Sequence, residues 1–61
     1  MSGEADTNGR VGEIAYALGR EARIDGLPRT ACPFAHPALS SRWLEGWRHI
    51  DEAVRMLAAT N

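Results

Sequence analysis

Three prolines, Pro28, Pro33 and Pro37, fall within ten residues near the middle of this 61-residue chain. A proline has no backbone N–H to donate, and it biases the residue before it away from helical backbone angles. One continuous helix through this region is therefore excluded. We interpret residues 26–40 as an ordered connector, because its apolar side chains are numerous enough to pack against the flanking segments. These side chains are Leu27, Cys32, Phe34 and Leu39.

The segment before the prolines has the apolar spacing of an amphipathic helix. Its aliphatic residues and alanines recur at steps of three and four, which is the helical period. They are Val11, Ile14, Ala15, Leu18 and Ala22. Thr7 or Asn8 can cap the start of such a helix, and Gly26 can end it. We therefore predict a helix over residues 10–25, preceded by a flexible arm of residues 1–9.

The segment after the prolines also predicts a helix, over residues 41–59, with Ser40 or Ser41 as its N-cap. Its apolar residues form one stripe on a helical wheel. They are Trp43, Gly46, Trp47, Ile50, Ala53, Val54 and Leu57. Asp51 and Arg55 have the i, i+4 spacing of a surface ion pair. We expect Leu18, Trp47 and Ile50 to form the centre of a single domain over residues 10–60.

Glycines recur every seven residues in the first half of the chain, at Gly12, Gly19 and Gly26. A glycine inside a helix costs ~1 kcal/mol relative to alanine, so the repeat indicates a packing role. With the alanines between them, these glycines would give the first helix a smooth strip that a second helix or an indole ring can approach closely. A phosphate-binding glycine loop requires a lysine after its second glycine, and the chain has no lysine.

The predicted fold class is all-α, a two-helix hairpin joined by a proline-rich connector, since no segment shows the alternation of a β-strand. A domain of this length buries only ~60% of the surface that its unfolded chain exposes. A homodimer in which two copies form a four-helix arrangement is therefore kept as an alternative to the monomer.

Charge and apolar patterning narrow the classes of function. Seven arginines and eight acidic residues give a formal net charge of −1, so the chain has no basic tail that could bind phosphates by charge alone. The longest apolar runs fall far short of the ~18 residues that span a bilayer, and the N-terminus lacks the pattern of a secretory signal. A single cysteine excludes an internal disulfide. We expect a cytoplasmic protein.

Cys32, His36 and His49 are the residues whose side chains could bind a metal or take part in catalysis. A structural zinc site takes four such ligands, and the chain has three. A catalytic thiol needs a neighbouring cation and a concave site, which two helices do not readily supply. We predict that Cys32 packs at the bend and that both histidines face solvent. No metal, cofactor, catalytic residue or small-molecule substrate is expected.

Several motifs together resemble the bacterial ribosome modulation factor family over residues 11–53. They are Gly19, Gly26, Cys32-Pro33-Phe34 and Trp43-Leu44-Glu45-Gly46-Trp47-Arg48. The resemblance implies a two-helix protein that binds the small ribosomal subunit, contacts ribosomal RNA and protein, and favours inactive ribosome dimers in stationary phase. Proteins of that family are strongly basic, whereas this chain begins MSGEADTNG. The wider grouping includes CrpP-type proteins, described as phosphorylating fluoroquinolone antibiotics, and this enzyme interpretation is the least favoured here.

The resemblance carries over two basic positions, Arg48 in the tryptophan motif and Arg29 before the cysteine. The first predicted helix adds further arginines where the family is polar or basic. We predict RNA contacts at Arg20, Arg23, Arg29 and Arg48, with Arg10 and Arg42 ranked lower. Tyr16 is a candidate for an exposed aromatic contact, whereas both tryptophans are expected in the core. The alternative function is a homodimeric protein-interaction module that does not bind RNA.

Overall fold

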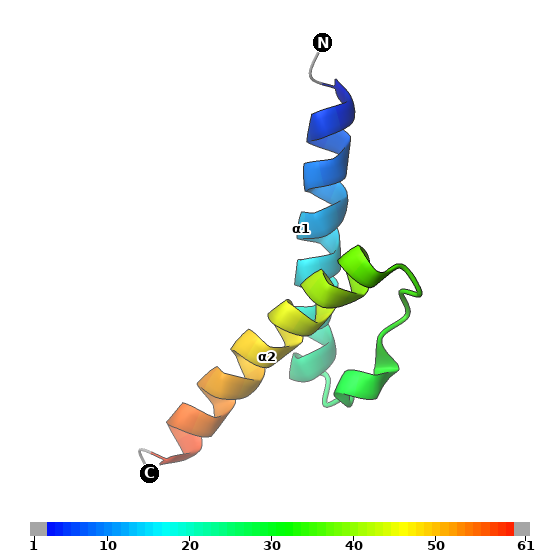
Figure 1. Ribbon diagram of the computed structural model, residues 1–61. Helices are drawn as coiled ribbons and strands as arrows, with labels where there is room; N and C mark the ends of the chain where they lie inside the picture. Colours follow the sequence, from blue (N-terminus) through cyan, green and yellow to red (C-terminus); the bar gives the residue numbers. More distant parts are fainter. Residues whose placement is uncertain (1–2, 60–61) are drawn as a thin grey trace.

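The computed structural model describes residues 3–59, with side chains from residue 10 onward. Its elements are α1 (Gly3–Ile24), a short 3-10 helix η1 (Arg29–Ala31) and α2 (Pro37–Ala59). The described chain contains no strand, and α1 packs directly against α2 (Figure 1). The prediction of an all-α fold with two packed helices is therefore confirmed.

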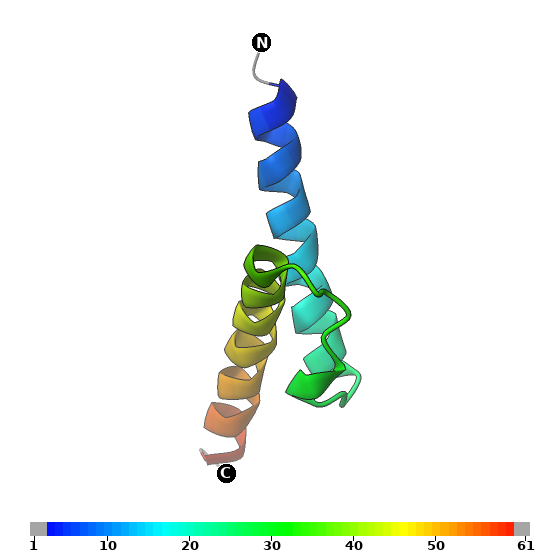
Figure 2. The same cartoon turned by 45° about the vertical axis from the view of Figure 1, so that its right-hand side comes forward.

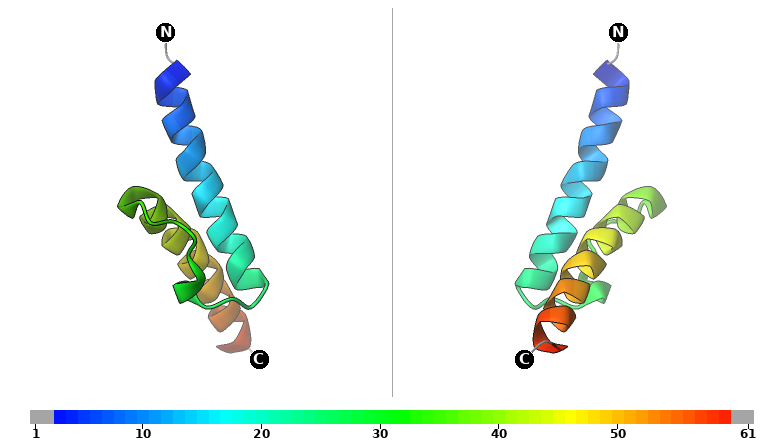
Figure 3. Two further views of the ribbon diagram at one scale, coloured as in Figure 1. Left: turned by 90° about the vertical axis from the view of Figure 1, so that its right-hand side faces the viewer. Right: turned by 90° about the vertical axis from the view of Figure 1, so that its left-hand side faces the viewer.

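The two helices run in the same general direction and cross at an angle (Figures 1 and 3). Side-chain contacts join the two helices at Tyr16 with His49 and at Arg23 with Asp51. Neighbouring helices in a tight hairpin would run in opposite directions. The connector, residues 25–36, makes this arrangement possible because its twelve residues can extend for up to ~40 Å and return to the level at which α2 starts.

Both helices begin earlier than predicted. α1 starts at Gly3 instead of Arg10, and α2 starts at Pro37 instead of Ser41. Proline suits the first helical position because the N–H that it lacks would have no partner there. The Nδ1 atom of His36 accepts a hydrogen bond of 3.2 Å from the Ala38 N–H, so His36 caps this end in place of a serine. Whether residues 1–9 act as a flexible arm stays a prediction, and Met1 and Ser2 lie outside the described residues.

The end of α1 agrees with the sequence. Gly26 has a φ of 85°, which a residue with a side chain adopts only with strain. Its N–H donates to the Arg23 carbonyl, and the Leu27 N–H donates to the Ala22 carbonyl. This pair of bonds is a Schellman cap, and it confirms Gly26 as the residue that ends the helix.

Two glycines let the helices touch backbone to backbone. A methyl group built on Gly19 would lie 1.8 Å from the Trp43 carbonyl oxygen, and one built on Gly46 would lie 2.0 Å from the Tyr16 carbonyl oxygen. No side chain fits at either position. The predicted packing role is confirmed at Gly19. Gly12 is packed more loosely, because a methyl group built there would lie 3.6 Å from Arg42 Nε.

This close approach determines the core. Trp43 is 2% exposed, and it forms the buried apolar core of the described chain together with Ala15 and Ala22. The prediction for Leu18 is wrong, since 43% of it is exposed, while Trp47 and Ile50 are half-buried. Small residues and one indole fill the narrow space at the crossing, and larger aliphatic side chains remain at its rim.

The connector is held against the helices by side-chain hydrogen bonds. Trp47 Nε1 donates to the Leu27 carbonyl at 2.8 Å, and the Cys32 thiol lies 3.4 Å from Ser40 Oγ. Cys32 is half-buried, which agrees with a packing role at the bend. Figure 2 shows the connector on one side of the crossing, while the first turns of α1 project beyond the start of α2. No helix in the described chain is long and apolar enough to cross a membrane.

Candidate nucleic-acid interface

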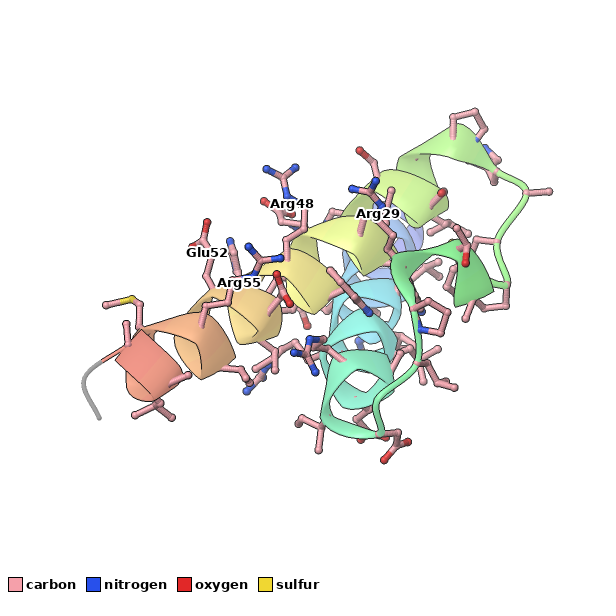
Figure 4. The ribbon with its side chains drawn as sticks, turned by 90° about the horizontal axis from the view of Figure 1, so that it is seen from below. Arg29, Arg48, Glu52 and Arg55 are labelled. Carbon is pink, nitrogen blue, oxygen red and sulfur yellow. The ribbon has the colours of Figure 1, made fainter. Side chains whose placement is uncertain are left out.

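Three arginines surround a shallow hollow between η1 and the middle of α2. Arg29 comes from η1, and Arg48 and Arg55 come from α2; all three are exposed (Figure 4). We call these three residues the arginine face. Arg48 and Arg55 share one side of α2 because seven residues make nearly two helical turns. Pro28, Trp47, Asp51 and Glu52 complete the lining of the hollow.

Trp47 positions η1 beside α2. Its indole ring lines the hollow, while its N–H fixes the Leu27 carbonyl two residues before Arg29. The Ala31 N–H then bonds to the Pro28 carbonyl and closes the single turn of η1. Residues that are nineteen apart in the sequence, Arg29 and Arg48, therefore lie at the same hollow.

Asp51 joins the two helices beneath this surface. Its Oδ1 atom accepts a 2.9 Å hydrogen bond from Arg23 Nε on α1, and its Oδ2 atom lies 3.0 Å from Arg55 Nε. The predicted ion pair between Asp51 and Arg55 is confirmed. The Arg23 guanidinium also lies over the Trp47 ring, 5.7 Å from its centroid. Arg23 therefore links α1 to α2 and does not line the hollow.

The Arg23 hydrogen bond lowers the pKa of Asp51 below its ordinary value of 3.8, and Arg55 adds to this effect while desolvation opposes it. A carboxyl group with a depressed pKa contributes stability above its unfolded-state pKa and loses it as the pH falls through the folded-state pKa. We expect the melting temperature of the protein to fall below pH ~4. Asp51→Asn should melt lower at neutral pH and lack this part of the decline. Parallel pH profiles for the two proteins would contradict the assignment.

Charge is distributed unevenly over the molecule. The lining of the hollow contains three arginines and two acids, Asp51 and Glu52, and so carries a formal charge of +1, whereas the remaining residues carry −2. The local charge of the hollow is therefore opposite in sign to the net charge of −1. Guanidinium groups can donate two hydrogen bonds to one phosphate, so the surface has the chemistry of a phosphate-binding site.

A second group of basic residues, His49, Arg20 and Arg42, lies around Tyr16. Its hydroxyl is 2.6 Å from His49 Nδ1, and the guanidiniums of Arg20 and Arg42 lie 6.0 and 5.2 Å from its ring centroid. Tyr16, the candidate for an exposed aromatic contact, is half-buried, while His49 is exposed as predicted. Arg20 does not line the hollow.

The structure thus brings together two of the four predicted RNA contacts, Arg29 and Arg48, and adds Arg55. Arg55 was visible in the sequence only as the partner of Asp51. The signal available in the sequence was its spacing from Arg48, because residues seven apart lie on the same side of a helix. Among the described residues, no three His, Cys, Asp or Glu side chains gather closely enough to hold a metal ion.

Comparisons with known proteins agree with the resemblance in the sequence. The family model described as ribosome modulation factor matches residues 4–57. "Ribosome modulation factor" from Hahella chejuensis is 39% identical over 36 residues, which cover 59% of this chain and 52% of that protein. "Ribosome modulation factor 1" from Colwellia psychrerythraea is 40% identical over 38 residues, which cover 62% and 67%.

The chain spans about half the length of the Hahella protein and about two thirds of the Colwellia protein. No solved structure matches significantly. The family match covers the whole connector and nearly all of both helices. The chain belongs to the ribosome modulation factor family.

Proposed function

We propose that this chain is a non-catalytic ribosome-associated protein whose arginine face binds ribosomal RNA of the small subunit. In this proposal it acts in the bacterial cytoplasm, favours inactive ribosome dimers in stationary phase and so restrains translation. The observation that carries the proposal is the local charge: a chain with a net charge of −1 places three of its seven arginines around one hollow.

The geometry of the arginine face supports contact with more than one phosphate. Arg48 and Arg55 are about 10 Å apart along the axis of α2, at 1.5 Å per residue. Arg29 approaches from the connector, so the three guanidiniums surround the hollow from two elements. Glu52 lies within the same lining and weakens the positive potential. We expect RNA to bind chiefly at the arginine face, and we expect salt to weaken this binding strongly.

The four arginines predicted from the sequence have different roles in this proposal. Arg29 and Arg48 belong to the arginine face and have no ion-pair partner among the described residues. Arg23 supports the face through Asp51, so its replacement would also disturb the packing of the helices. Arg20 stays a predicted contact at a separate place, beside Tyr16.

Replacing Arg29 and Arg48 together with glutamine should weaken association with purified small ribosomal subunits by about tenfold or more, because glutamine cannot form the charge-assisted hydrogen bonds that two arginines donate to phosphate. The helicity of the chain should not change, since both side chains are exposed. Sedimentation of the tagged protein with small subunits at low salt measures the effect.

The matched control is the double variant Arg10→Gln and Arg42→Gln, which removes the same charge elsewhere. It should keep most of the association. An equal decrease in both variants would mean that binding follows net charge and not the arginine face. Wild-type protein that fails to sediment with ribosomes but forms stable dimers in analytical ultracentrifugation would favour the homodimeric interaction module.

A further inference from the structure

A second hollow lies between the C-terminal part of α1 and the connector. Its walls include Leu18, Leu27 and Pro33, Trp43 lies at its base, and Glu21 and Asp25 stand at its edge. We call it the apolar–acidic hollow. It shares no lining residue with the hollow of the arginine face.

The apolar part of this hollow is open to a partner. Leu18 and Leu27 are 43% and 47% exposed, while the base formed by Trp43 is closed. The exposed apolar surface continues along α1 through Ile14 to Val11. These residues share one helix face because they are spaced by four and three residues. The strip from Val11 to Leu18 is about 10 Å long.

The edge of the hollow carries negative charge that is not neutralised within the described chain. Glu21 and Asp25 are both exposed and have the i, i+4 spacing that places them side by side. Neither takes part in an ion pair with another described residue. No arginine lines this hollow. The C-terminal end of α1, where both acids lie, adds the negative end of the helix dipole.

We infer that the apolar–acidic hollow is a docking site for a basic amphipathic segment of a protein partner. An aliphatic side chain of the partner would sit between Leu18 and Leu27, and flanking lysines or arginines would pair with Glu21 and Asp25. Charge complementarity excludes RNA here, because phosphates would be repelled by the two acids.

A second copy of this chain is also a poor occupant. In a two-fold symmetric contact built on this surface, the same patch of each copy faces the other. Glu21 and Asp25 of one copy would then approach Glu21 and Asp25 of the other, and like charges disfavour that contact. The inference does not depend on RNA binding by the arginine face, and the two surfaces together would let the chain bridge a basic protein and a nucleic acid.

The test uses the isotopically labelled full chain and two synthetic helical peptides, one of leucine and lysine and one of leucine and glutamate. The lysine peptide should cause saturable amide shifts in two-dimensional NMR spectra, concentrated at residues 18–27 and 31–34. The glutamate peptide should cause none at these residues. Leu18→Gln should weaken binding of the lysine peptide several-fold without any change of charge.

Charge reversal makes the test decisive. Glu21→Arg with Asp25→Arg should weaken binding of the lysine peptide by tenfold or more and should create binding of the glutamate peptide at the same residues. The control, Glu13→Arg with Glu45→Arg, has the same net charge, lies outside both hollows and should keep the wild-type preference at these residues. Equal weakening in the control, shifts centred elsewhere, no binding of the lysine peptide, or a wild-type dimer that buries this hollow would each overturn the inference.

Discussion

Gly19→Ala and Gly46→Ala are each expected to destabilise the protein by about 3 kcal/mol or more, although alanine is the better helix former by ~1 kcal/mol. The added methyl group would meet a backbone carbonyl oxygen of the other helix, at 1.8 Å and 2.0 Å respectively. Backbone cannot turn aside as a side chain can, so the helices must separate. Thermal melts followed by far-UV circular dichroism measure the destabilisation.

Gly12→Ala is the matched control for this prediction. Its new methyl group would meet only the Arg42 side chain, at an ordinary contact distance of 3.6 Å. The substitution should leave stability unchanged or raise it by up to ~1 kcal/mol through helix propensity. Melting temperatures at or above wild type for the alanine variants of Gly19 and Gly46 would show that the crossing is not as close as described.

Trp43→Ala is expected to cost ~3–5 kcal/mol and to leave the chain largely unfolded at 25 °C. A protein of this length has only ~3–9 kcal/mol of total stability. Trp43 is 2% exposed and is the largest side chain in the core. Urea denaturation should give a smaller destabilisation for Trp47→Ala, because Trp47 is half-buried and Arg23 covers one side of its ring. The reverse order would contradict this description of the core.

The elements of the fold could be predicted from the sequence because their signals are local. Prolines at 28, 33 and 37 exclude a continuous helix, and Gly26 ends α1 through backbone bonds to residues a few positions away. The first residues of the helices were harder to predict from the sequence. Serines near the second helix offered a familiar cap, whereas the cap in the structure is the imidazole of His36 beside Pro37.

The composition of the core could not be predicted from periodicity alone. An apolar stripe shows which face of a helix is buried, but not how closely the other helix approaches. Gly19 and Gly46 bring the backbones into contact, so alanines and one indole fill the crossing. Leu18 belongs to the predicted stripe and yet lies at the rim, where it lines the apolar–acidic hollow.

The candidate site shows the same division. Arg29 and Arg48 could be selected because they accompany recognisable motifs. The engagement of Arg23 by Asp51 depends on the crossing of the helices, and these residues are 28 positions apart. The net charge of −1 does not indicate RNA binding, and only the folded chain shows that Arg29, Arg48 and Arg55 lie around one hollow.

The most direct test of the proposed function is the salt dependence of binding to purified small ribosomal subunits. We expect the wild-type affinity to fall linearly on a log–log plot between about 50 and 300 mM salt, because bound cations are displaced from RNA phosphates. The double variant at Arg29 and Arg48 should flatten the slope by ~0.7–0.9 for each phosphate that it no longer neutralises. No association at about 50 mM salt, or an identical slope for wild type and variant, would contradict RNA binding by the arginine face.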